Sequence, residues 1–500
     1  MSVFNRSKSK AFKTAMTLAL IALSPFSAFG MAFDAEVDIL IVGGGMSGLT
    51  AAHALKKSGV NAALFEGRDR LGGRTHTHYF NDGKTQFFEE GGTFIDNDHH
   101  TVINLAKEMG VNLIHRGYGT RNFTTTYQGN LQDTQKLLEE ITKIQETLSQ
   151  LVNSIDWNEP QKYDPHTQKC PERPLYPHLS QLSDFGRSFI QTYYEDETGM
   201  SINKASIYQL KSLLKKIKEY RELLIYKNNP QVPKEIIDER AFDYTVEGGM
   251  STLVNSVASK LDPENIHLGH QLTHVRKDGK YILTFQAENG TKTISANDVI
   301  MTIPFSTLRH VMIDESVPLR DDQRQAIQTL SYGTNSKIGI PIESPSNLYN
   351  ELAYYFNFDT LRCGWPGHNA FTLMVNAEEG ENLDQDSASH IWSQERPSLQ
   401  QAYPLINSFG EFVIKNWSQD PFALGSYSAS TMEDSPLLLL PSQITEFEGI
   451  SQFAEPTKDG HFLFAGEHTR SDNSVCHIEG AVRSGYKAAE LLMNSRSRMK

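Results

Sequence analysis

The sequence VDILIVGGGMSGLTAAHAL, residues 37–55, contains the pattern that decides the fold of this 500-residue chain. The mostly apolar residues 37–42 predict a buried parallel strand. Residues 46–58 follow with apolar side chains at helical spacing, and residues 61–65 predict a second strand. The segment therefore predicts a βαβ unit.

The glycines between the first strand and the helix fit the pattern G-x-G-x-x-G. Gly43 allows the tight turn, Gly45 lets the backbone approach a pyrophosphate, and Gly48 lets helix and strand pack closely. Ser47 lies at the helix N-terminus, where the dipole favours phosphate. Glu66, 18 residues after Gly48, is placed to accept from both ribose hydroxyls and disfavours a 2′-phosphate. The pattern predicts a dinucleotide site, but its spacing does not choose between FAD and NAD.

A second glycine pair follows in RDRLGGR, residues 68–74. Gly73 would add a main-chain donor, and Arg68 and Arg74 would add guanidinium groups beside the same pyrophosphate.

These residues resemble the flavin-containing amine oxidase family, which includes monoamine, polyamine and L-amino acid oxidases. The stretches FEGRDRLGGRTHT (65–77) and EEGGTFID (89–96) resemble its N-terminal signatures. The likeness returns at YTVEGGMSTLVNSVASKL, DVIMTIP, YGTNSKIGI, NWSQDPFALGSYS, FLFAGEHT and CHIEGAVRSGYKAAELL. It implies an α/β fold with a Rossmann-like FAD-binding domain assembled from three segments, an α+β substrate domain and a helical insertion.

The resemblance also implies which residues hold FAD. They include the glycines and Glu66 named above, Val275, whose backbone would meet the adenine, Trp417 and Ile478 beside the isoalloxazine, and four others: Gly91, Gly92, Gly466 and Glu467. At the reactive face, Lys337 matches the lysine that holds a water beside flavin N5. Tyr427 and His477 fall on the two walls of the family's aromatic cage, and all four of Lys337, Trp417, Tyr427 and His477 are predicted catalytic residues.

Three departures from the family pattern bear on chemistry. Ser426 replaces the cysteine that links flavin in animal-type monoamine oxidases, so we expect non-covalent FAD. His477 replaces an aromatic residue, and an imidazolium at this wall of the cage would repel a protonated amine, which puts a preference for simple monoamines in question. Phe94 stands where L-amino acid oxidases carry an arginine for the substrate carboxylate, although another arginine, such as Arg362, is a candidate substitute.

A polar cluster at Asp96, Asp98, His99 and His100 suggests a metal site at first sight. Adjacent histidines rarely share one ion, so we expect no metal and interpret Asp96 or Asp98 as the N-cap of a helix starting near Thr101.

Composition limits the remaining possibilities. The net charge of −13 argues against nucleic acid as a partner. Basic residues precede the apolar run 15–23 and an Ala28-Phe29-Gly30 cleavage pattern, which predicts a signal peptide over 1–30 and a secreted or periplasmic protein. No other stretch is long and apolar enough for a membrane span. Cys170, Cys363 and Cys476 permit at most one disulfide.

The length predicts two to three domains. We expect an FAD-binding domain from 36–124, 240–303 and 456–496, a helical insertion over 125–239, and a substrate-binding domain over 304–455. Helices are expected over 132–155 and 208–226, an irregular proline-rich stretch over 157–177, and a helical tail within 387–404. Phe189, Tyr193 and Tyr194 are candidate site-lining residues on a helix of the insertion.

The function that these observations favour is FAD-dependent oxidation of an amine to an imine and then an aldehyde, with dioxygen reduced to hydrogen peroxide. The alternative is an L-amino acid oxidase. Alternatives of other classes are a flavoprotein dehydrogenase, a non-oxidase binding flavoprotein and a desaturase or porphyrinogen-type flavoprotein. The sequence leaves the amine, the electron acceptor and the oligomeric state open.

Overall fold

A computed structural model describes residues 33–115, 124–154, 179–205, 210–228, 243–343, 354–429, 454–470 and 476–498. The predicted signal peptide, the proline-rich stretch 157–177 and Cys170 lie outside the described residues.

The first sheet gathers strands that are far apart in the sequence. β1 (Ala35–Val42) runs parallel to β2 (Ala63–Phe65) on one side and to β13 (Gly290–Met301) on the other. β21 (Phe462–Phe464) is also parallel to β13. The sheet order is β10-β2-β1-β13-β12-β11-β14, with β21 beside β13. The remaining strands are β10 (Ile266–His267), β11 (Gln271–Asp278), β12 (Lys280–Ala287) and β14 (Met312–Ile313).

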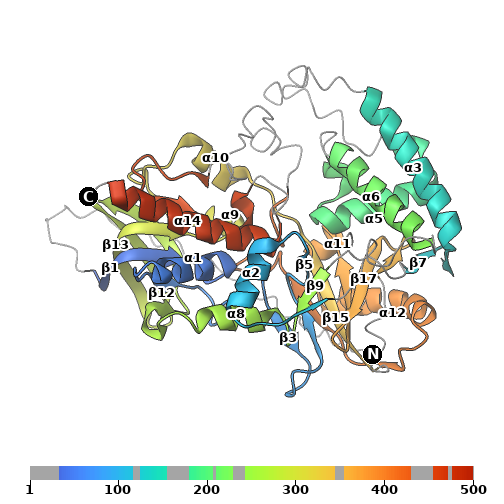
Figure 1. The fold of residues 1–500 in the computed structure, drawn as a ribbon, viewed down its shortest axis with the longest axis horizontal. Coiled ribbons are helices and arrows are strands. Elements are labelled where there is room, and N and C mark those ends of the chain that lie inside the picture. The colour runs from blue at the N-terminus through green and yellow to red at the C-terminus, as the bar shows by residue number, and fades with distance from the viewer. Residues whose placement is uncertain are drawn as a thin grey trace, which may run out of the picture.

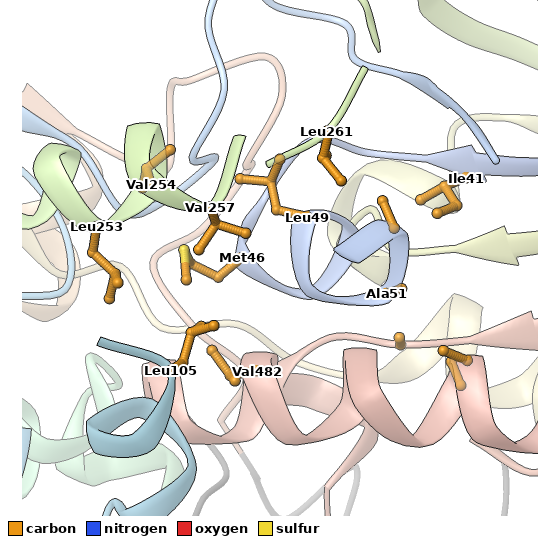
Figure 2. Packing of buried hydrophobic residues seen from close by; sticks show 14 of the residues in the cluster. Ile41, Met46, Leu49, Ala51, Leu105, Leu253, Val254, Val257, Leu261 and Val482 are labelled. Carbon is orange, nitrogen blue, oxygen red and sulfur yellow. The ribbon is translucent and has the colours of Figure 1, made fainter. Parts of the chain in front are cut away.

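Four helices pack around a shared apolar core beside this sheet. They are α1 (Met46–Lys57), α2 (His100–Glu108), α8 (Met250–Ala258) and α14 (Ile478–Arg498). Figure 2 shows Leu49 of α1, Val257 of α8 and Val482 of α14 among the buried side chains of this core. Gly485 lets α14 approach α1, because a Cβ there would collide with the main-chain oxygen of Ser47. The first and last segments of the chain thus form one unit (Figure 1), as the three-segment prediction required.

A second sheet of antiparallel character forms the other half of the molecule. Its order is β19-β15-β18-β17-β16-β7-β8, with β20 also beside β15. Most neighbours are antiparallel, and β16 and β7 are parallel. The strands are β15 (Ser336–Glu343), β16 (Tyr355–Asn357), β17 (Arg362–Gly367), β18 (Ala370–Val375), β19 (Ser408–Phe409), β20 (Val413–Asn416), β7 (Thr124–Tyr127) and β8 (Asn130–Leu131).

The segment predicted as a helical insertion begins with strands. Residues 124–127 are Thr-Thr-Thr-Tyr, and β-branched and aromatic residues favour strands. β7 joins the second sheet through β16, so its backbone belongs to the substrate-side half of the fold. The helices α3 (Thr134–Ser154), α5 (Asp184–Thr198) and α6 (Leu210–Asn228) then follow and lie over one end of this half (Figure 1). These helices confirm the helical part of the prediction.

Two local expectations are wrong. The region 387–404 is helical almost throughout, because α12 (Gln385–Ala402) begins with a capping box in which Asp384 accepts the N–H of Ser387. The N-cap of α2 is His99, and neither Asp96 nor Asp98 caps it. The main-chain N–H groups of Thr101 and Val102 donate instead to Glu479 of α14.

Short elements complete the fold. A hairpin joins β3 (Thr77–Tyr79) and β4 (Phe87–Glu89), and a small sheet has the order β5-β9-β6. Its strands are β5 (Ile95–Asp96), β9 (Asp243–Val246) and β6 (Leu113–His115); the short helices are α9 (Phe305–Leu308), α10 (Asp321–Thr329) and α11 (Ala377–Glu381). None of the helices within the described ranges combines the length and the apolarity that a membrane span requires.

Candidate active site

A cavity of about 1110 Å³ lies between the first sheet and the second. At one end it is lined by residues that follow the carboxyl ends of β1, β2 and β13, which is where ligands bind in open α/β sheets. At the other end it is lined by Lys337, Met374 and Trp365 of the second sheet. Small-molecule sites commonly measure roughly 300–1,000 Å³, so the cavity has room for a large cofactor together with a small substrate.

The glycine turn after β1 has the geometry that its sequence predicts. Gly43 has a φ of +108°, which favours glycine. A Cβ at Gly48 would collide with the main-chain oxygen of Gly43, so the helix packs directly on the turn. A Cβ at Gly45 would meet no atom within 4 Å, because Gly45 faces the cavity. The N-terminus of α1 is therefore open to a phosphate group.

Glu66 is held in place by main-chain donors at both of its oxygen atoms. Its Oε2 accepts the N–H of Gly44 at 2.6 Å, and its Oε1 accepts the N–H of Arg68 at 2.8 Å. The carboxylate has lone pairs left on both oxygens. Main-chain donors therefore fix the Glu66 carboxylate at the wall of the cavity.

The two arginines predicted beside the pyrophosphate line the cavity and form ion pairs. Arg68 donates two hydrogen bonds to Asp420, at 2.9 and 2.6 Å. Arg74 donates from one nitrogen to Glu467 and to the main-chain oxygen of Ser426, both at 2.9 Å. Arginine has five N–H donors, so donors remain for a phosphate, and the ion pairs fix both guanidinium groups.

Gly91 and Gly92 line the cavity beside Lys337. We call the first-sheet end of the cavity the cofactor end and its second-sheet end the reactive end. A Cβ at Gly91 would collide with the main-chain oxygen of Arg74 at 1.7 Å, and a Cβ at Gly92 would meet the side chain of Ile478 at 2.7 Å. Trp417 donates its indole N–H to the main-chain oxygen of Glu90 at 2.8 Å. Glycine at both positions therefore lets this segment pack directly on the main chain of Arg74 and on Ile478.

Most predicted cofactor residues line the cavity, and two do not. Gly48 does not line the cavity, because it packs against the main chain of the glycine turn, as its predicted packing role requires. Val275 is fully buried in the core of the first sheet, away from the cavity. Leu272, three residues earlier in β11, lines it instead. Gly43, Gly45, Ser47, Glu66, Arg68, Gly73, Arg74, Gly91, Gly92, Trp417, Gly466, Glu467 and Ile478 all line the cavity.

Lys337 lies at the reactive end with its ammonium group satisfied by neutral oxygens. Nζ donates to the main-chain oxygens of Glu89 (3.2 Å) and Gly91 (2.5 Å) and to Oγ1 of Thr93 (3.0 Å). Burial lowers the pKa of Lys337 to about 8, against the opposing effect of the Glu89 carboxylate. Burial likewise raises the pKa of Glu89 to about 7. Lys337 and Glu89 are thus two buried groups whose pKa values, about 8 and about 7, both lie near neutral pH.

Aromatic side chains surround the lysine. Nζ of Lys337 lies 5.2 Å from the centre of the Trp365 ring, and Trp365 packs against Phe94 with ring centres 5.3 Å apart. Tyr427 donates its hydroxyl to the main-chain oxygen of Asp196 at 2.8 Å. Burial raises the pKa of Tyr427 well above its ordinary value, so the phenol remains neutral. The reactive end is thus an aromatic chamber around one ammonium group.

His477 also lines the cavity. Its ring lies edge-on to His99, with ring centres 5.1 Å apart. Potential metal-ligating atoms of Asp96, His99 and His477 lie within 4.8 Å of one another. However, Nδ1 of His99 accepts the main-chain N–H of Asp96, so its Nε2 carries the proton and has no lone pair for an ion. Burial also lowers the pKa of His99 and keeps the ring neutral.

Cys476 and Cys363 are both free thiols. Sγ of Cys476 donates to the main-chain oxygen of Ser428 at 2.8 Å, and burial raises the pKa of this thiol. Cys363 is fully buried, and its pKa is raised in the same way. Neither cysteine has the depressed pKa that a reactive thiolate requires.

The candidate arginine for a substrate carboxylate is engaged elsewhere. Arg362 is buried behind the second sheet, where it pairs with Glu395 (3.1 Å) and Glu379 (2.8 Å) and does not line the cavity. Among the described residues that line the cavity, the only arginines are Arg68 and Arg74, both at the cofactor end. The reactive end therefore offers no guanidinium to a carboxylate within this part of the chain.

Sequence reasoning missed several residues of the reactive end, among them Trp365 and Met374 of the second sheet and the three described next. Thr93 accepts a hydrogen bond from the ammonium group of Lys337. Asn335 is buried and accepts the hydroxyl of Ser426, and Asp196 lies in the last turn of α5. Tyr193 and Tyr194 line the cavity, as their candidate role requires, but Phe189 is packed in the core of the helical region. No local sequence pattern marks Asp196, because its place in the cavity depends on how α5 packs.

Comparisons with known proteins identify the family of this chain. The family described as flavin containing amine oxidoreductase matches residues 46–493. Polyamine oxidase 5 of Oryza sativa is 26% identical over 91% of this chain and 87% of its own. A flavin-dependent L-tryptophan oxidase of Lentzea aerocolonigenes is 25% identical over 91% and 97%. A solved putrescine oxidase variant superposes with a TM-score of 0.65 at 20% identity, over 92% of this chain and 99% of its own.

The chain belongs to the flavin containing amine oxidoreductase family. It is an α/β oxidoreductase whose dinucleotide half is suited to a flavin cofactor. The open Gly45, the Glu66 carboxylate fixed by main-chain donors and the guanidinium groups of Arg68 and Arg74 fit the diphosphate and ribose parts of such a cofactor.

Replacing Lys337 by Met tests its buried charge. Between pH 8 and 10.5 the unfolded chain binds more protons at this lysine than the folded one, so the wild type gains stability relative to Lys337→Met as the pH rises. We expect a gain of about 3 kcal/mol across this range, measured by urea unfolding of both holoproteins. A difference that does not change with pH would contradict the depressed pKa.

Proposed function

We propose that this protein catalyses the FAD-dependent oxidative deamination of an amine that lacks a carboxylate. The products would be an imine, hydrolysed to an aldehyde, and hydrogen peroxide from dioxygen. The observation that carries the proposal is the reactive end of the cavity, where Lys337 lies within aromatic walls and the cavity-lining arginines are both ion-paired at the other end.

Each wall of the cavity has a defined task in this proposal. When bound, FAD supplies the electron acceptor for the carbon–nitrogen bond. Trp417 and the main chain at Gly91 and Gly92 would hold the flavin ring, and Lys337 would supply a positive charge at the reactive end while its amine is protonated. Trp365 and Tyr427 exclude water and hold the amine by their ring faces.

Ser426 supports a non-covalent cofactor. Its hydroxyl donates to Asn335 at 2.8 Å, and serine provides no thiol for a thioether to flavin. The thiol of Cys476 is protonated and engaged with Ser428.

Oxidation of an L-amino acid is the second candidate, since one relative is named a tryptophan oxidase. The position of Phe94 within the aromatic chamber and the burial of Arg362 count against it. A dehydrogenase would oxidise the amine at the same site and pass the electrons to an acceptor other than dioxygen. The residues of this site therefore do not distinguish a dehydrogenase from an oxidase.

Anaerobic titration of the purified holoprotein distinguishes these candidates. We expect tyramine to bleach the flavin absorbance and L-phenylalanine to leave it unchanged, because the reactive end lacks a guanidinium partner for the carboxylate. Readmitted air should then restore the absorbance and produce one hydrogen peroxide per flavin.

Each other outcome has a definite meaning. Bleaching by L-phenylalanine alone would contradict the amine proposal. Bleaching by tyramine without peroxide in air would identify a dehydrogenase. Bleaching by neither compound, nor by a diamine, would exclude oxidation of these amines.

A second prediction concerns the attachment of FAD. Acid precipitation of the holoprotein should leave the yellow chromophore in the supernatant, with the mass of intact FAD, because Ser426 and Cys476 form no bond to it. A yellow pellet would contradict non-covalent binding.

We also propose that the protein is exported, on the basis of the predicted signal peptide over residues 1–30. Expression of the full chain in a bacterial host should yield a periplasmic or secreted product whose N-terminus, by Edman sequencing, starts near Met31. A product that keeps Met1 and stays in the cytoplasm would contradict export.

A further inference from the structure

The last turn of α5 forms part of the reactive end of the cavity. The helix ends at Thr198, and Gly199 closes it with a φ of +68° and an N–H donated to Glu195. Residues of this turn line the cavity: Tyr193, Tyr194, Asp196, Glu197 and Thr198. A segment that is remote in sequence from the dinucleotide motifs therefore contributes side chains to the chamber around Lys337.

The second sheet presents a row of side chains toward this turn. Lys337 of β15 is directly opposite Met374 of β18, which is directly opposite Cys363 of β17. Residues in such register share one face of a sheet. Trp365 lies two residues beyond Cys363 and is therefore on the same face. The face that carries Lys337 thus extends across β18 to Cys363 of β17, which contacts the Asp196 side chain of α5.

Cys363 joins this row to the side chain of Asp196. Its Sγ lies 2.8 Å from Oδ1 of Asp196 and donates the thiol proton to that carboxylate. Burial and the nearby Asp196 raise the pKa of Cys363, so the thiol keeps its proton. Cys363 thereby holds one oxygen of the carboxylate over the sheet face.

The main chain of Asp196 is fixed independently of its side chain. Its carbonyl oxygen accepts the Tyr427 hydroxyl at 2.8 Å and Nδ2 of Asn335 at 3.0 Å. Asn335 is buried and also accepts the hydroxyl of Ser426 at 2.8 Å. A Cβ at Gly199 would collide with Asn335, so the helix can end here only with glycine. A change of the Asp196 side chain leaves these main-chain contacts in place.

The charge of Asp196 acts on the groups of the reactive end. It opposes the burial that lowers the pKa of Lys337, and it adds to the burial that raises the pKa of Tyr427. The titratable groups that face it are Lys337 from β15, Cys363 from β17, Tyr427 from the 417–429 segment, and Glu197 from its own helix.

We propose that Asp196 is a substrate-binding and proton-accepting residue of this enzyme. The inference rests on the proposed amine oxidation. An amine arrives at neutral pH as an ammonium ion, and the Asp196 carboxylate binds it beside the aromatic walls. One N–H bond of the ammonium breaks and an O–H bond forms on the carboxylate. No electron is lost or gained in this step, and the nitrogen regains the lone pair that oxidation of the adjacent carbon requires.

The other carboxylates around the cavity have different tasks. Both oxygens of Glu66 hold main-chain N–H groups at the cofactor end. Glu467 binds Arg74 and the hydroxyl of Ser428. Glu89 is buried and accepts the N–H of Met250 and the hydroxyl of Thr77. Asp96 lies beside His99, on the α2 side of the cavity.

The test compares Asp196→Asn with Glu197→Gln in the holoenzyme. Both changes remove one carboxylate from the same helical turn, and Glu197 is exposed at the cavity margin. The first readout is binding of α,α-dimethylbenzylamine, which has no hydrogen on the carbon bearing nitrogen and cannot be oxidised. By calorimetry at pH 7 we expect Asp196→Asn to weaken its binding at least ten-fold and Glu197→Gln less than three-fold. Binding of the neutral analogue isopropylbenzene should not change in either variant.

The second readout is the pH dependence of flavin reduction by tyramine under anaerobic rapid mixing. Without a proton acceptor only the neutral amine reacts, so the rate constant of Asp196→Asn at low tyramine should rise about ten-fold per pH unit from pH 6 to 9. The wild type and Glu197→Gln should show a shallower rise. A purely structural role of Asp196 would change the rate without changing this slope.

Two results would overturn the inference. One is equal affinity of Asp196→Asn and the wild type for α,α-dimethylbenzylamine. The other is the same pH slope in both proteins. Failure of the proposed function is distinguishable, because the wild-type flavin would then stay oxidised with every amine tested.

Discussion

The contact between the main chain of α1 and the turn after β1 is the constraint on which the rest of the structure depends. Gly48 packs directly against the oxygen of Gly43, so strand and helix meet without intervening side chains. This contact sets the N-terminus of α1 at the edge of the first sheet and aims Gly45 at the cavity. The hydrogen bond of Glu66 to Gly44, the parallel pairing of β1 with β13 and the packing of α14 on α1 all depend on where this contact holds β1 and α1.

The buried ammonium of Lys337 connects the two halves of the molecule at the reactive end. The lysine comes from the second sheet, and all its acceptors belong to the segment 89–93 that follows the glycine motifs. Burying this charge lowers its pKa to about 8 and makes the position sensitive to the nearby carboxylates Glu89 and Asp196. Lys337 therefore has two effects. Its hydrogen bonds join the second sheet to the segment 89–93, and its ammonium group places a positive charge at the reactive end.

Much of the fold and part of the site could be predicted. The glycine turn and Glu66 lie at the cavity as the spacing of the dinucleotide motif predicts, because their geometry is set by the main chain, and Lys337 lines the cavity as the family resemblance predicts. The side chain of Val275 is buried in the core of the first sheet, whereas Leu272 of the same strand lines the cavity, so the predicted backbone contact of Val275 with the adenine stays a prediction. Arg362 was a candidate for a substrate carboxylate, and its partner Glu395, 33 residues away, keeps it behind the sheet.

The sequence by itself determined the dinucleotide half, the family and the departures at Ser426 and Phe94. Those features are local, because a turn, a helix N-terminus or a missing thiol depends on a few neighbouring residues. Only the tertiary structure decided which side chains meet at the reactive end. Asp196, Cys363 and Tyr427 come from α5, β17 and the 417–429 segment, and they meet through packing that no spacing along the chain encodes. Chemistry that depends on long-range packing is therefore visible only in the folded protein.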